Sequence, residues 1–214
     1  MPRRDRTSGL RRAGARREPR PRILVVCEGR LTEPSYFRAL RVEFRNSLLA
    51  VEIEEGGATP KRLVERAVAI KREAEHEARS QRDSFLAYDE VWCVFDVDEH
   101  PFLAEARQQA RDNGVELAVS NPCFELWALV HFQEQWAFLE RNEARRSLKR
   151  HLPEYNKALP FERLKPHYWA AVDRARQLDR RCEGAGRLGD NPSTGVYRLT
   201  ERIREGGRTG LPAR

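Results

Sequence analysis

The stretch VWCVFDVDEH, at residues 91–100, decides the fold. Residues 91–95 carry no charge and are β-branched, aromatic or cysteine, which is typical of a strand buried on both faces in a parallel sheet. This apolar run ends at Asp96, and a second aspartate, Asp98, follows two residues later. Because side chains alternate along a strand, the two carboxylates are expected on one side, about 7 Å apart at their backbones.

Two carboxylates at this spacing resist joint ionisation unless a cation lies between them. Mg²⁺ and Mn²⁺ both accept oxygen ligands such as carboxylates. In an open α/β sheet, bound molecules and ions lie at the carboxyl ends of the strands. The sequence therefore predicts that Asp96 and Asp98 hold a divalent metal. The alternative is that these acids only cap the helix that follows.

Similar apolar runs recur on both sides of this stretch, and each is followed by a pattern typical of a helix. Strands are expected at 23–27, 48–53 and 115–119, and helices at 32–44, 60–78, 101–111 and 124–132. Thr32 and Thr59 are expected to be the N-caps of the first two helices. This alternation predicts the α/β class, with a parallel sheet sandwiched by helices and right-handed crossovers.

From residue 133 onward the chain is helical, basic and less apolar. Helices are expected at 134–150 and 166–182, with a last one ending near 204. The segment NPST, at 191–194, is expected to form the turn that caps this last helix, or to close over the edge of the sheet. The predicted divisions are a disordered basic arm (1–22), an α/β core (23–132), a helical appendage that packs on the core (133–205) and a loose tail (206–214).

The composition narrows the class of protein. A chain of 214 residues suits one domain with a small addition, and no apolar run approaches the ~20 residues that span a bilayer. The arginine-rich start has no apolar segment and so does not resemble a signal peptide. The four cysteines lack CxxC spacing, which argues against a zinc site. Buried, reduced thiols make the cytoplasm the expected location.

The net charge of +7 belongs to the amino-terminal arm. Residues 1–22 hold nine arginines and two acids, whereas the remainder holds 31 basic and 31 acidic side chains. An arm of this kind binds nucleic-acid phosphates without sequence preference, and we expect contacts from Arg11, Arg12, Arg16 and Arg17. The alternative is a solubilising tail or a misassigned start codon.

Polar residues also follow the neighbouring strands. Glu28 comes directly after 23–27, and Asn121 follows 115–119. The carboxyl ends of parallel strands meet at one edge of a sheet, so these side chains are expected near Asp96. Glu125 stands among apolar residues one turn further on, where a carboxylate requires a partner or a metal.

Two further residues have both a catalytic and a structural explanation. Glu33 could take part in catalysis, or could only complement the positive end of its helix. His100 precedes Pro101 and could donate to a phosphate, or could only cap the next helix. For Asn121 the alternative to a ligand contact is a simple turn before Pro122.

Glu28 followed by Asp96-x-Asp98 two strand units later resembles the Toprim domain. That domain is shared by type IA and type II topoisomerases, bacterial primases, recombination-mediator proteins and nucleases of the overcoming-lysogenization-defect type. Four motifs in order resemble the RloB-like family: CEGRLTEPSYF (27–37), FDVDEH (95–100), SNPCFELW (120–127) and NPST (191–194). These proteins are encoded near restriction-modification loci and are implicated in abortive phage defence. The resemblance implies a Toprim-type core with a helical appendage.

These observations together predict a Mg²⁺- or Mn²⁺-dependent nuclease of a defence system. The expected metal ligands are Asp96, Asp98 and Glu125; the expected catalytic residues are Glu28, Glu33 and His100; Asn121 and the arm arginines are expected to contact nucleic acid. One alternative is a non-catalytic subunit that binds nucleic acid or a nucleotide, and another is a ribonuclease. The chain has no Walker motif, so any ATPase of the system is expected to be a separate protein.

Overall fold

The computed structural model describes residues 21–53, 59–97, 103–184, 186 and 189–206. Within these residues, five strands form one sheet in the order β2-β1-β3-β4-β5. The strands are β1 (Ile23–Cys27), β2 (Leu49–Ile53), β3 (Glu90–Asp96), β4 (Glu116–Asn121) and β5 (Ser193–Thr194). The first four are parallel, as the sequence predicts, and β5 runs antiparallel to β4. The α/β class with a mostly parallel, helix-flanked sheet is therefore confirmed.

Strand β5 was not predicted from the sequence, which favoured a turn at 191–194. Two residues are too few to show the alternation by which strands are recognised. Its position comes from long-range pairing: Ser120 pairs with Thr194, and their hydroxyl groups lie 2.8 Å apart in a buried hydrogen bond. Thr194 has no exposed surface. The 191–194 segment thus belongs to the sheet.

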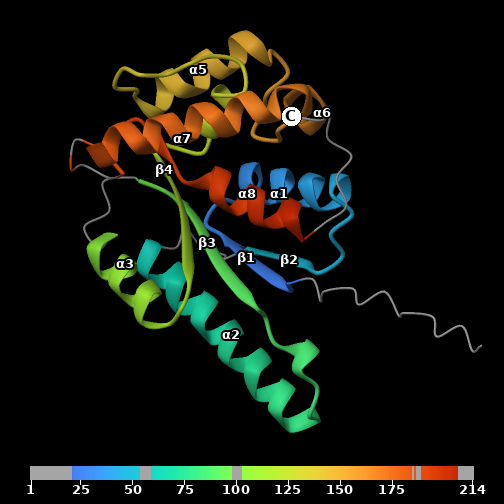
Figure 1. Ribbon diagram of the computed structural model, residues 1–214. Helices are drawn as coiled ribbons and strands as arrows, with labels where there is room; N and C mark the ends of the chain where they lie inside the picture. Colours follow the sequence, from blue (N-terminus) through green and yellow to red (C-terminus); the bar gives the residue numbers. More distant parts are fainter. Residues whose placement is uncertain (1–20, 54–58, 98–102, 185, 187–188, 207–214) are drawn as a thin grey trace, which may run out of the picture.

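Helices cover both faces of the sheet (Figure 1). On one face lie α2 (Pro60–Gln81) and α3 (Leu103–Asp112), whose apolar residues pack with Val91, Cys93 and Phe95 of β3. The other face packs Trp92 and Val94 against α1 (Thr32–Glu43) and α8 (Val196–Glu205). The central strand is therefore buried on both faces, because its side chains alternate between two cores.

The two predicted helix caps have different outcomes. The hydroxyl oxygen of Thr59 accepts a hydrogen bond from the Arg62 amide at 3.4 Å, so Thr59 is the N-cap of α2 as predicted. The prediction for Thr32 was one residue off. Thr32 is the first helical residue of α1, the cap position is Leu31, and no side chain caps that end.

The carboxyl-terminal half contains α4 (Glu125–Leu129), α5 (Arg141–His151), α6 (Phe161–Leu164) and α7 (Tyr168–Gly184). Helix α4 is shorter than the 124–132 predicted, and α5 begins later than the 134–150 predicted. The intervening backbone is held by a distant residue instead: the Asn191 side chain bonds the Leu139 amide and carbonyl at 2.9 and 2.8 Å. None of the described helices is both long enough and apolar enough to cross a membrane.

Residues of the predicted appendage share a hydrophobic core with the sheet. Tyr36 and Phe124 pack edge to face with ring centroids 5.6 Å apart, and Phe161 of α6 lies 5.6 Å from Tyr36. Tyr168 of α7 similarly contacts Phe44. The two halves of the described chain therefore share one continuous hydrophobic core. The domain boundary predicted at residue 133 stays a prediction.

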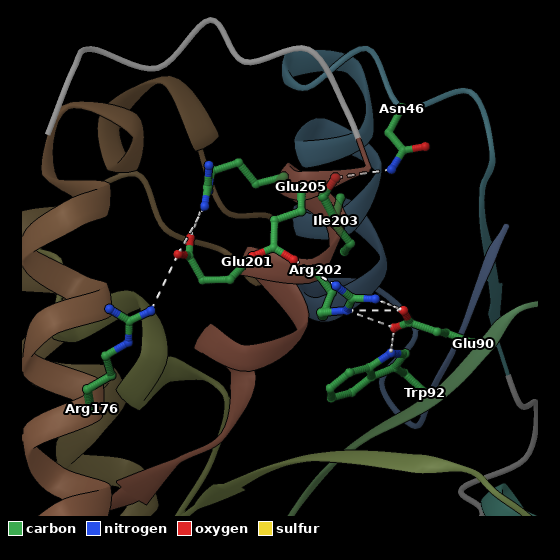
Figure 2. A network of polar contacts seen from close by, with 9 residues as sticks. Asn46, Glu90, Trp92, Arg176, Glu201, Arg202, Ile203 and Glu205 are labelled. Carbon is green, nitrogen blue, oxygen red and sulfur yellow. Dashed lines mark hydrogen bonds and ion pairs between the residues drawn. The ribbon is translucent and has the colours of Figure 1, made fainter. Parts of the chain in front are cut away.

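A polar network fastens α8 to β3 and α7, and Figure 2 shows its members. Glu90 accepts hydrogen bonds from Arg202 Nε at 3.0 Å and from Trp92 Nε1 at 3.1 Å. On the other side of α8, Glu201 accepts from Arg204 at 3.1 Å and pairs with Arg176 at 3.5 Å. Exposed ion pairs contribute ~0–1 kcal/mol each, so the network mainly fixes the orientation of the helix.

Asn46 is a buried polar residue of this region, and its replacement by alanine is expected to destabilise the fold by about 1–3 kcal/mol. The side chain is 1% exposed; it donates to the Ile203 carbonyl and accepts from the Leu48 amide, both at 3.1 Å. Alanine would leave both backbone groups without this partner. Urea denaturation measures the loss, with the exposed Asn142→Ala as control. Equal stabilities of the two variants would show that the bonds contribute nothing.

Candidate active site

The sheet order places a crevice at the carboxyl ends of β1 and β3. After β1 the chain enters α1 on one face of the sheet, whereas after β3 it continues to α3 on the other face (Figure 1). In open α/β sheets such a switch point is where ligands bind, and in the order 2-1-3-4-5 it lies between strands 1 and 3. Glu28 follows β1 directly and Asp96 ends β3. Their side chains therefore flank the switch point.

A cavity of about 360 Å³ opens at this edge. Its wall contains the carboxylates Glu28, Glu33, Asp96 and Glu125, together with the cations Arg30, Arg141, Arg145 and Lys157. Glu28 and Asp96 are linked directly, because Glu28 Oε2 accepts the Asp96 amide at 3.4 Å. Four predicted site residues from four different segments thus line one cavity.

Glu33 is in the first turn of α1 and is only 6% exposed. Burial raises its pKa to about 7, and the nearby charges of Glu125 and Glu28 add to the effect. Its carboxyl group lies against Gly29, where a Cβ atom would stand 2.6 Å from the Glu33 Cδ atom. Glycine at position 29 therefore makes room for this carboxylate.

Asp96 has protein partners for both oxygens. Oδ1 accepts the Phe124 amide at 2.8 Å, and Oδ2 accepts from Arg141 at 3.1 Å. Burial raises the pKa of Asp96 well above its ordinary value and Glu33 raises it further, while Arg141 acts in the opposite direction. Burial and the neighbouring carboxylates thus favour the protonated form of Asp96, whereas the Arg141 guanidinium favours the ionised form.

Glu125 has the partner that its apolar neighbours in the sequence require. It is 4% exposed, and Oε1 accepts from Arg145 Nε at 2.9 Å and from the Tyr155 hydroxyl at 3.0 Å. Burial opposes ionisation, but hydrogen bonds from Cys123 and Arg145 outweigh it and lower the pKa of Glu125. This carboxylate is therefore ionised and firmly oriented.

Sequence reasoning missed the cations of the cavity. Arg141 and Arg145 come from α5 and Lys157 from the loop after it. One signal was available: a buried glutamate at 125 demands a cation, and basic residues recur every four positions from 141. Which of the many arginines would meet Glu125 depends on the tertiary fold.

The remaining predicted site residues lie elsewhere or outside the described residues. Asn121 ends β4 and donates to the Gly189 carbonyl at 3.0 Å, and it is not among the residues that line the cavity. Asp98 and His100 lie outside the described residues, as do the arm arginines Arg11, Arg12, Arg16 and Arg17. Among the residues that the structure describes, no three His, Cys, Asp or Glu side chains form a group that could hold a metal ion.

The family of the chain follows from a comparison with protein-family models. The model of the RloB-like proteins matches residues 23–203. The chain belongs to the RloB-like family. The match spans the sheet, the helices around it and all four motifs by which the sequence resembles the family, so that resemblance is confirmed. Searches of curated proteins and of solved structures gave no match for this RloB-like chain.

The raised pKa of Glu33 predicts a pH-dependent stability. The ordinary pKa is 4.5 and the folded value is about 7, so the folded protein holds this proton more tightly than the unfolded chain. The resulting stabilisation is complete below pH ~4.5 and is lost as the pH rises through 7, by about 3 kcal/mol in total. Glu33→Gln should therefore gain stability relative to wild type between pH 5 and pH 8.

Urea denaturation in EDTA at both pH values measures this difference. Glu73→Gln, on the exposed face of α2, is the matched control and should show no such trend. A difference between Glu33→Gln and wild type that stays constant from pH 5 to pH 8 would contradict the raised pKa.

Proposed function

We propose that this RloB-like protein hydrolyses phosphodiester bonds in nucleic acid with the help of a divalent metal. One observation carries the proposal: four carboxylates and four cations line a cavity at the β1/β3 switch point. Carboxylates supply metal ligands and proton carriers, while guanidinium groups suit phosphate oxygens.

Glu28 and Asp96 offer the carboxylate oxygens that Mg²⁺ and Mn²⁺ prefer, and a third ligand would come from Asp98, outside the described residues. Asp96 would hold the metal together with Asp98, and Glu28 would serve as a further ligand or as a proton acceptor. Each oxygen of Asp96 accepts one hydrogen bond, from Phe124 or Arg141, and so keeps a second lone pair. When bound, such a metal activates a water molecule and shields negative charge on the phosphate.

The protein side chains would carry the rest of the reaction. The water oxygen bonds to phosphorus, the ester P–O bond breaks, one proton leaves the water and one reaches the departing oxygen. Glu28 would accept the first proton, and Glu33, whose pKa is about 7, would donate the second. Arg141 and Arg145 would stabilise the added charge on the phosphoryl oxygens. Glu125 would position Arg145 through their 2.9 Å bond.

The finer assignments belong to the same proposal. Glu28 after β1 and Asp96 at the end of β3 support a Toprim-type core, and the RloB-like membership supports a role in phage defence. Buried free thiols at Cys27, Cys93 and Cys123 suit a reducing cytoplasm. A separate ATPase of the defence system would be a partner.

The proposal is tested by incubating the full chain with plasmid, single-stranded DNA and bulk tRNA in Mg²⁺, Mn²⁺ or EDTA. Cleavage that depends on the metal is the expected result, and cleavage of tRNA alone would make the protein a ribonuclease. Binding without cleavage of any substrate, even with the products of neighbouring genes added, would contradict the proposal and favour a non-catalytic binding subunit.

A further inference from the structure

A second cavity, of about 680 Å³, adjoins the candidate active site. The two cavities share Glu125, Arg145 and Lys157 in their walls, so they lie side by side. The second is built by α5 and the loop that follows it. We call it the α5 groove.

The α5 groove is basic and its outer cations are not neutralised. Its wall holds Arg145, Arg146, Lys149 and Lys157 against the acids Glu125 and Glu140. Arg146, Lys149 and Lys157 are exposed and make no ion pair with any residue that the structure describes. Three exposed cations without ion-pair partners among the described residues, gathered at a concave surface, attract a polyanion.

The spacing of cations along α5 continues from the carboxylate site into the groove. Arg141, Arg145 and Lys149 stand four residues apart on one helix face, about 6 Å of rise per step. Arg141 contacts Asp96 and Arg145 contacts Glu125, whereas Lys149 is beyond the carboxylates. The row of cations therefore runs outward from the site along a single line.

The other groove residues favour a polar chain over an apolar partner. Asn142 and Asn156 are exposed amides that donate and accept hydrogen bonds, and the aromatic residue in the wall, Tyr155, is 4% exposed. An apolar peptide would find no exposed hydrophobic anchor here. A flat lipid surface would not enter a concave groove between α5 and its loop.

We propose that the α5 groove binds the phosphate backbone of a single nucleic-acid strand and leads it into the carboxylate site. The inference rests on the proposed function for the chemistry at the end of this path. A single strand is favoured because Glu33 and Glu125 lie at most 6% exposed in a cavity of about 360 Å³, the size that holds one small ligand. A rigid duplex is too broad to enter a cavity of this volume, so its outward-facing phosphodiesters would stay at the rim, away from Glu33 and Glu125.

The test is the salt dependence of binding, measured in EDTA by fluorescence anisotropy with labelled oligothymidylate and oligouridylate of about 15 nucleotides, and with a labelled DNA duplex of the same length. Loss of two phosphate contacts in Arg146→Ala/Lys149→Ala should weaken binding and make the slope of log K against log salt shallower by about 1.4. The control Arg62→Ala/Arg79→Ala removes the same charge from α2, on the opposite face of the sheet, and should leave the slope unchanged. Lys157→Gln, a single change in the loop, should reduce the slope by about 0.7.

Three results would contradict the proposal that the α5 groove binds a single strand. They are no binding of either single strand by wild type, equal salt slopes of binding in the groove and control variants, or tighter binding of the duplex than of the single strands. These readouts do not depend on cleavage. If the reaction fails but the slope changes as expected, only the proposed function is wrong. If wild type and the groove variants cleave and bind alike, only the groove is wrong.

Discussion

Replacing Glu28 with glutamine is expected to slow metal-dependent strand cleavage by ~100- to 10,000-fold, the usual contribution of general acid–base catalysis. Glu28 extends from the end of β1 to the Asp96 amide, which its Oε2 accepts at 3.4 Å. Glutamine has nearly the same shape and keeps an oxygen for that bond, but it cannot exchange a proton. Fold and nucleic-acid binding should therefore survive, while the initial rate on a labelled oligonucleotide with Mn²⁺ should collapse.

The same variant distinguishes two roles of Glu28. Partial recovery of the rate at high Mn²⁺ would identify a metal ligand, whereas a rate that stays low at every Mn²⁺ concentration would identify the proton acceptor. Glu73→Gln, on the exposed face of α2, controls for the loss of one carboxylate and should be fully active. Full activity of Glu28→Gln would place the chemistry elsewhere.

Asp96→Asn is expected to weaken Mn²⁺ binding by at least ~10- to 100-fold, because even residues that only orient metal ligands have effects of this size. Asparagine retains an oxygen for the Phe124 amide but loses the charge, and its NH₂ group would face Arg141. Isothermal titration of wild type and variant measures the loss, and Asp96→Asn/Asp98→Asn should bind still more weakly. Equal affinities would remove the metal from these residues.

Glu125→Gln separates the two roles that this carboxylate has been given. The sequence predicts a metal ligand, whereas its bonds to Arg145 and Tyr155 favour an anchor for the arginine. Retained Mn²⁺ affinity with slower cleavage would make it the anchor. A loss of affinity as large as that of Asp96→Asn would make it a ligand.

The sheet could be predicted because burial on both faces demands long apolar runs. The strands at 23–27 and 91–96 each contain such a run, and a parallel sheet then brings the residues after them, Glu28 and Asp96, to one edge. Strand β5 could not be predicted, since two residues form a strand only by pairing with Ser120 and Asn121 from far away in the chain.

The carboxylates of the site could be predicted from the sequence, but their partners could not. The apolar residues around Glu125 indicate that its carboxylate is buried and needs a cationic partner. The sequence has 40 lysines and arginines and does not indicate which of them is that partner. The answer depends on where α5 begins and how it packs on α4. The basic α5 groove could not be predicted either. Residues 23–214 are formally neutral, and composition does not show on which face of the fold the charges gather.

The most direct test of a metal held between β1 and β3 is the anomalous scattering of Mn²⁺ in crystals of the wild-type protein. We expect a peak within about 2.5 Å of carboxylate oxygens of Asp96 and Glu28, and its disappearance in crystals of Asp96→Asn. A protein that cleaves nucleic acid in Mn²⁺ but shows its bound ion only at other residues would contradict the proposed site.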